Sequence, residues 1–390
     1  MQASMRVIGL LKPLMIAFSI LCCAPQGYSE GQKAADSRDL ELHPHMQIAY
    51  QNLVKILNAT ARDTDSRSPA ERSKIEAHLK ALADEATIIH RMVLSGDKGH
   101  EFLSEELQRS SGLAYSRYSA GFREQAKFHI SEVVNACFGC HTSRESSHDS
   151  SFTASFSKDL ELESFDSLAR ARFLTLSRRF EDSASEYERI LKSNNINADE
   201  MINFDPVVEY LILTLRVKND QRRALKTLEA MQKNTYPEVI KQDLEAWSKA
   251  LRAVPLADNH GNGLERGRAL IALAKGQMEF PKDRSGMVQY VLASKYIQEF
   301  LRTENLTDLD KAQGYYELGG CELLLSTPYS ADEANIYFAE TIRLSPKTPL
   351  SKKAFTRYEE NLVNGYSGSS GYHLPEDEAK KLNELRKISF

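Results

Sequence analysis

The segment Cys137-Phe138-Gly139-Cys140-His141 combines residue types and spacing that point to a defined chemistry. Residues three and four positions apart lie on one face of a helix, so both thiols and the imidazole can point the same way. In an exported protein, a Cys-x-x-Cys-His segment attaches haem through two thioether bonds, and the histidine binds the iron. Because this pattern occurs once, the sequence predicts one covalent haem c on Cys137, Cys140 and His141.

Three alternatives to haem attachment are open at this stage. A zinc site needs a second pair of ligands, and Cys321 with scattered histidines does not supply one at the usual spacing. A thioredoxin-like dithiol expects a βαβ context, whereas the neighbouring sequence is helical in pattern. The third alternative is that the pentapeptide occurs by chance.

Residues 1–29 are typical of an export signal. Arginine and lysine flank the apolar run LMIAFSILCCA, which is too short to span a bilayer comfortably. We predict cleavage before Glu30 and a soluble product in a bacterial periplasm. An uncleaved anchor and a lipid on Cys23 are the alternatives, and only they would bring the chain to a membrane; the residues before Cys23 make a poor lipobox.

The bulk composition excludes several classes of protein. The chain has 390 residues, 42% hydrophobic and 27% charged, with a formal net charge of -4. This length predicts two or three domains, and the mild charge argues against a nucleic-acid partner, which needs a concentrated basic face. Removal of the signal leaves three cysteines, an odd number that favours a local site over a disulfide framework.

Apolar spacing predicts four helices between residues 40 and 144. The first follows a polar stretch from Glu30 to about Leu40, and the second begins at Ser68 with a capping box closed by Glu71. A turn at Gly96 to Gly99 and another at Gly121 separate the last two. The apolar positions are Met46, Ala49, Leu53, Ile56 and Leu57; Ile75, Leu79, Leu82, Ala86, Ile89 and Val93; Phe102, Leu103, Leu107 and Leu113; and Phe122, Ala126, Ile130, Val133, Ala136 and Cys140.

Residues 145–158 are rich in serine and predict a linker, after which residues 159–390 carry helical spacing only. Several stretches resemble tetratricopeptide helix pairs, so this domain is expected to be an α-solenoid, with an irregular helical array as the alternative. Glycines 365, 368 and 371 should interrupt it before a last helix from Pro375 to about Lys387. The pair-forming positions are Ala171, Leu174, Ser183, Tyr187 and Ile190; Ile212, Leu215, Ala224, Leu228 and Met231; Ala293, Ile297 and Phe300; and Tyr315, Leu318, Gly319, Ala334, Phe338 and Thr341.

Residues 40–144 resemble the class II cytochromes c, the cytochrome c-prime type of four-helix bundle, in which the attachment motif ends the last helix. The resemblance implies Met46 as a candidate distal iron ligand, with His43 and His45 as alternatives from the same turn. Core packing is the competing role for Met46, since methionine on an apolar helix face usually fills space. The chain departs from the family after His141, where Arg144 is the only nearby positive charge.

Together these patterns predict an all-α protein: a four-helix cytochrome bundle followed by an α-solenoid of tetratricopeptide-like helix pairs. We expect no enzyme activity, but electron transfer with a partner protein docked by the repeat domain. A five-coordinate haem sensor and an assembly scaffold with a structural haem are the alternatives. The polar run from Asp258 to Gly263 is expected to be a turn, and Cys321 a buried core residue.

Overall fold

The computed structural model describes residues 30–60, 68–94, 101–143, 165–193, 205–253, 262–279, 283–303, 305–325, 331–369 and 371–390. The predicted signal peptide, the turn at Gly96 to Gly99 and the linker at 145–158 lie outside these ranges. The described chain is helical except for strands β1 (Ser367–Gly368) and β2 (Gly371–Tyr372), which pair antiparallel. The all-α class is therefore confirmed, and the two short strands mark the predicted interruption.

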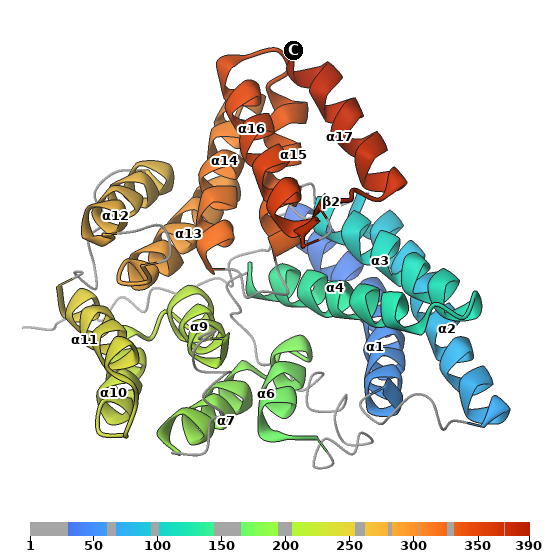
Figure 1. The fold of residues 1–390 in the computed structure, drawn as a ribbon, viewed down its shortest axis with the longest axis horizontal. Coiled ribbons are helices and arrows are strands. Elements are labelled where there is room, and N and C mark those ends of the chain that lie inside the picture. The colour runs from blue at the N-terminus through green and yellow to red at the C-terminus, as the bar shows by residue number, and fades with distance from the viewer. Residues whose placement is uncertain are drawn as a thin grey trace, which may run out of the picture.

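The first four helices are α1 (Glu30–Thr60), α2 (Pro69–Leu94), α3 (Glu101–Ser119) and α4 (Arg123–Thr142) (Figure 1). Neighbours in sequence pack together from α1 to α4, and α4 also contacts α6, η2 and α15 of the following region. The start of α2 is the predicted capping box, since the Ser68 amide donates to Glu71 at 2.8 Å and the Glu71 amide to Ser68 at 3.3 Å. All six predicted apolar residues of α2 are buried.

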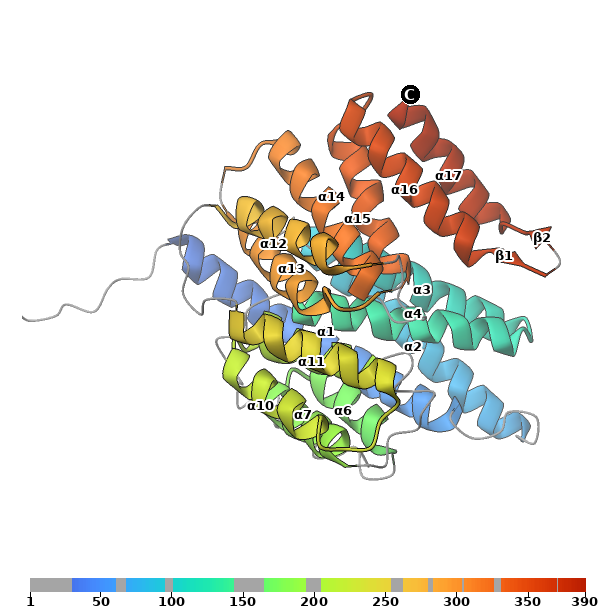
Figure 2. The same cartoon turned by 60° about the vertical axis from the view of Figure 1, so that its left-hand side comes forward.

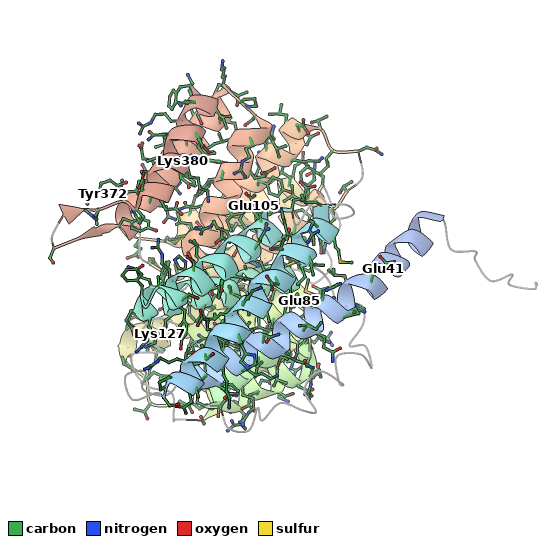
Figure 3. All side chains as sticks on the ribbon, turned by 90° about the vertical axis from the view of Figure 1, so that its right-hand side faces the viewer. Glu41, Glu85, Glu105, Lys127, Tyr372 and Lys380 are labelled. Atoms are coloured by element: carbon green, nitrogen blue, oxygen red, sulfur yellow. The ribbon has the colours of Figure 1, made fainter. Side chains whose placement is uncertain are left out.

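Helix α1 is longer than predicted, because it already begins at Glu30. The stretch before Leu40 includes glutamate, lysine, glutamine and alanine, which favour helix even without an apolar face to bury. Glu41 lies on the part of α1 that projects away from the other helices (Figure 3). Near the end of α3, Ala114 is buried, whereas the neighbouring Leu113, which the sequence predicted to be apolar core, is half-buried.

The turn between α3 and α4 is made by Gly121, which has φ of +88°. Only glycine adopts this conformation without cost from a β-carbon. The amide of Phe122 donates to the carbonyl of Arg117 at 2.8 Å, and this bond reverses the chain into α4. The predicted break at Gly121 is therefore confirmed.

The region after residue 165 is a series of helices that pack largely as neighbours in sequence, among them α6 on α7, α10 on α11, α12 on α13 and α14 on α15. Figures 1 and 2 show them curving around α4 and ending in α17. Their bounds are α6 (Ser167–Leu176), α7 (Phe180–Lys192), α9 (Asp205–Leu211), the π-helix η2 (Ile212–Val217), α10 (Gln221–Met231), α11 (Glu238–Ala253), α12 (Gly263–Gln277), α13 (Met287–Leu301), α14 (Asp308–Leu325), α15 (Ala331–Leu344), α16 (Pro349–Gly365) and α17 (Glu376–Ser389).

The pair α14–α15 shows why a small residue stands where the repeat pattern places one. A β-carbon on Gly319 would lie 2.8 Å from the Phe338 ring and 3.2 Å from the carbonyl oxygen of Ala334. The two helices approach this closely because the glycine leaves room for the ring. All pair-forming positions predicted from the sequence are buried, Gly319 included.

The regions before and after the predicted linker pack against each other. The Phe102 ring of α3 lies edge-on to Tyr315 of α14 and Tyr337 of α15, with ring centres 5.5 and 5.2 Å apart. The Tyr50 hydroxyl of α1 donates to the carbonyl of Phe173 in α6 at 3.3 Å. Among the described helices, none combines the length and the apolar character that a bilayer span requires.

Candidate functional site

The predicted attachment residues occupy the last two turns of α4. The helix closes with the Ser143 amide donating to the Gly139 carbonyl at 3.0 Å and the Ser143 hydroxyl donating to the Cys140 carbonyl at 2.8 Å. Cys137, Cys140 and His141 are each half-buried. Because they stand at positions i, i+3 and i+4 of one regular helix, their side chains leave neighbouring positions on its surface.

Two apolar clusters meet at this end of α4. Cys137 packs against the cluster formed by α1 to α4 and α6, whereas Cys140 packs against the larger cluster that joins α3 to the later helices. Phe138, between them in sequence, contacts both clusters. The Nδ1 atom of His141 is also buried. The three predicted donors therefore lie in surroundings that an apolar macrocycle would favour over water.

Burial raises the pKa of the Cys137 thiol to about 12, well above the usual value of 9.0. The low-polarity surroundings oppose the thiolate, so Cys137 is a neutral thiol at physiological pH. Cys137, Cys140 and Cys321 all occur as thiols rather than disulfides. Cys321 is fully buried on α14, as predicted, and burial raises its pKa as well.

A positive charge that the sequence did not predict lies at the end of α4. The Arg302 guanidinium donates to the Ser143 carbonyl at 3.2 Å, across 159 positions of the chain. This is a favourable place for a cation, since the C-terminal end of a helix carries partial negative charge. Arg144, the cation predicted from the sequence, lies outside the described residues.

Met46 lies on α1, half-buried, and packs against the same cluster as Cys137. Because this cluster extends over α1 to α4 and α6, membership in it suits both the ligand role and core packing. His43 is half-buried in the same turn. His45 has a carboxylate partner, because its Nδ1 lies 2.7 Å from Glu85.

The other histidines of the first four helices contact polar side chains. His78 lies 2.9 Å from Asn52, and His90 lies 2.9 Å from Ser104. These contacts agree with the structural roles that a lone helical histidine usually has. His100 lies outside the described residues.

Sequence reasoning also missed a charge network on the first half of α4. Arg109 of α3 lies 2.7 Å from Glu106, 3.7 Å from Glu132 and 3.5 Å from Glu378 of α17. His129 lies 2.6 Å from Glu132. Although burial opposes it, the Arg109 charge holds the pKa of Glu106 below its usual value. Spacing alone could have suggested only the pair Glu106 and Arg109, which are three positions apart.

In the described ranges, no three histidine, cysteine, aspartate or glutamate side chains gather as a metal site, and this holds for Cys137, Cys140 and His141 as well. The loop predicted as a turn ends in Asn262, whose side chain caps α12 by accepting from the Glu265 amide at 2.9 Å.

Searches against protein-family models, curated proteins and solved structures find no match to this chain. The functional argument therefore depends on the residues and their geometry alone.

Proposed function

We propose that this protein is a periplasmic c-type cytochrome that carries one haem on Cys137, Cys140 and His141 and transfers electrons to or from a partner protein. The observation that carries the proposal is the placement of these residues. They end one regular helix, between two apolar clusters and next to the Arg302 cation.

The donor set fits a covalently attached haem. In each attachment a cysteine sulfur bonds to one vinyl carbon, and the other vinyl carbon takes up a proton, so no oxidant or reductant is consumed. His141 would bind the iron, and its buried Nδ1 excludes water from that side of the ring. Arg302, at the end of α4, would offer a positive charge to the haem carboxylates. Once bound, the haem exchanges single electrons.

In this proposal, α1 to α4 form the haem bundle and residues 159–390 form a tetratricopeptide-like solenoid. Sequential packing of α1 to α4 supports the first assignment. The helix pairs and the Gly319–Phe338 contact support the second. The solenoid would dock the partner, because helical-repeat surfaces commonly bind other proteins. Electron transfer needs such docking to bring two redox groups close together.

Met46 separates the leading function from a second one. As the sixth ligand, its sulfur would raise the reduction potential and suit electron transfer. If the sixth position is open, the same site would suit a sensor of small gaseous ligands. Met46 and Cys137 belong to one apolar cluster, which is compatible with the first assignment and equally with core packing.

The test is to produce the full precursor in a bacterium with a cytochrome-maturation system and to analyse the periplasmic product. We expect one covalent haem by intact mass, a reversible one-electron titration and an absorption spectrum that carbon monoxide does not change. A polypeptide without haem would overturn the proposal. A spectrum that shifts fully with carbon monoxide would replace electron transfer by gas sensing.

Two variants provide the matched comparison. Cys137→Ala with Cys140→Ala should abolish covalent haem. Cys321→Ala, which removes a buried thiol elsewhere, should leave the haem content unchanged. An equal loss in both would show a folding defect and not a haem site.

A further inference from the structure

A second site lies beside the proposed haem segment, along α4. A cavity of about 470 Å³ opens between α4, α6 and α9, with Ile212 of η2, the end of α1 and part of α14 completing the wall. This volume falls in the range of small-molecule sites, roughly 300 to 1,000 Å³. Phe138, Phe165 and Phe173 give the wall an aromatic character, and Cys137, Cys140 and His141 are not part of it.

Charged side chains at the wall are paired with opposite charges. Arg172 donates from its Nε to Glu209 at 2.9 Å, and Glu209 also accepts from the Tyr187 hydroxyl at 2.8 Å. Lys127, near the start of α4 in Figure 3, lies 2.8 Å from Glu124. These partners neutralise the cations, so an anionic ligand would find no uncompensated positive charge.

The acidic groups at the wall are compensated too. Asp166 caps α6 by accepting from the Ala169 amide at 2.9 Å, where a helix favours negative charge. Glu322 lies 2.6 Å from Arg216, and both side chains are at most 4% exposed. The occupant that fits this balance of charge is neutral.

Two neutral hydroxyls at the wall define the polar end of the ligand. The Thr60 hydroxyl donates to the Ile56 carbonyl at 2.9 Å, and the Ser131 hydroxyl donates to the Phe128 carbonyl at 2.6 Å. Each has thereby used its proton within its own helix and offers its oxygen as an acceptor. A ligand that donates one or two hydrogen bonds would be recognised here.

The wall also contains part of a π-helix. The segment η2 is a π-helix, a rare conformation that occurs frequently at functional sites, and it contributes Ile212 to the cavity. The same segment holds Arg216 in its buried pair with Glu322, and such pairs are often no more stabilising than apolar residues of similar size. A rare type of helix and a buried ion pair at one wall are consistent with a binding role.

We propose that this cavity binds a neutral phenolic compound of one or two rings, with the rings against the phenylalanines and the hydroxyl directed to Thr60 or Ser131. The proposal stands whether or not haem is attached to α4, because no attachment residue lines the cavity.

Calorimetric titration of the purified full chain with three naphthalene probes tests the class of ligand. We expect 2-naphthol to bind with a micromolar dissociation constant. We expect 2-methoxynaphthalene, which lacks the donor, to bind about three- to tenfold more weakly, the range for one neutral hydrogen bond. Naphthalene-2-sulfonate should not bind measurably, since the cavity offers it no unpaired cation. The proposal would be overturned if all three probes bound with equal affinity, or if none of them bound.

Variants locate the site. Ala169→Phe places a ring in the cavity and should abolish 2-naphthol binding, whereas Ala230→Phe, at a half-buried position on α10 away from the wall, should not. Ser131→Ala keeps the shape and should weaken 2-naphthol about three- to tenfold without changing 2-methoxynaphthalene. If Ala169→Phe does not fold, Ser131→Ala and Thr60→Val decide together: a 2-naphthol affinity unchanged in both variants would contradict the proposal.

Discussion

The two halves of α4 differ in how their polar groups are compensated. The first half carries His129 and Glu132, which belong to the network around Arg109 and reach Glu378 on α17. The second half carries Cys137 and His141 in apolar surroundings, with Arg302 at its end. Charge is matched by charge in the first half, whereas in the second half the thiols and the imidazole are half-buried beside apolar residues.

The two halves therefore differ in what they offer. A closed charge network joins α3, α4 and α17 in the first half. The second half places two thiols and an imidazole beside apolar residues, where our proposal puts the haem. The following predictions test that contrast, beginning with the largest effect.

The largest effect should be on the reactivity of the Cys137 thiol in the second half of α4. With its pKa near 12 against a usual 9.0, Cys137 in the folded, haem-free chain holds about a thousandfold less thiolate near neutral pH. Iodoacetamide should therefore alkylate it about a thousandfold more slowly than in the urea-unfolded chain, as followed by peptide mass. Equal rates in both states would show that Cys137 is not buried.

Replacement of Arg109 tests how much the charge network on the first half of α4 stabilises the fold. Arg109→Met leaves Glu106 and Glu132 buried without their cation, and we expect a loss of about 3 to 5 kcal/mol in the free energy of unfolding. Urea denaturation measures it. Arg343→Met breaks an exposed pair with Glu340 and should cost less than about 1 kcal/mol. Similar costs for both variants would remove the distinction between the two halves.

The turn into α4 should be sensitive to a single methyl group. Gly121→Ala forces a β-carbon into a φ of +88° and should cost roughly 1 to 2 kcal/mol. Gly320→Ala, inside α14 with open space around its β-carbon, should instead stabilise by up to about 1 kcal/mol. Thermal denaturation of both variants compares them, and a gain for Gly121→Ala would contradict the assigned turn.

The smallest effect should be on the pH dependence of stability. Because the folded pKa of Cys137 is raised to about 12, the unfolded chain loses this proton first as pH rises above the usual value of 9.0. Its contribution is fully present below pH 9 and is lost between pH 9 and 12, at a cost on the order of 1 kcal/mol by pH 10. Cys137→Ala should flatten the fall of the melting temperature in that window. No difference from the unmodified haem-free chain would contradict the shift.

The sequence alone determined the local features of the protein. Helical spacing predicted the buried face of α2, the capping pair of Ser68 and Glu71 defined its start, and Gly121 placed the turn before α4. The Cys-x-x-Cys-His pattern was recognised in the same way, and its role as a haem site stays a prediction. These features depend on residues within about one helical turn of each other, so periodicity and turn chemistry suffice to find them.

Tertiary structure decided which partners those helices meet. The Arg302 contact with Ser143, the Arg109 contact with Glu378 and the cavity wall beside Phe138 all join positions far apart in the chain. A helical pattern shows that a face is buried but not what covers it, because many helices offer similar apolar faces. The raised pKa of Cys137 has the same origin, since burial by several helices, rather than any neighbour in sequence, opposes its ionisation.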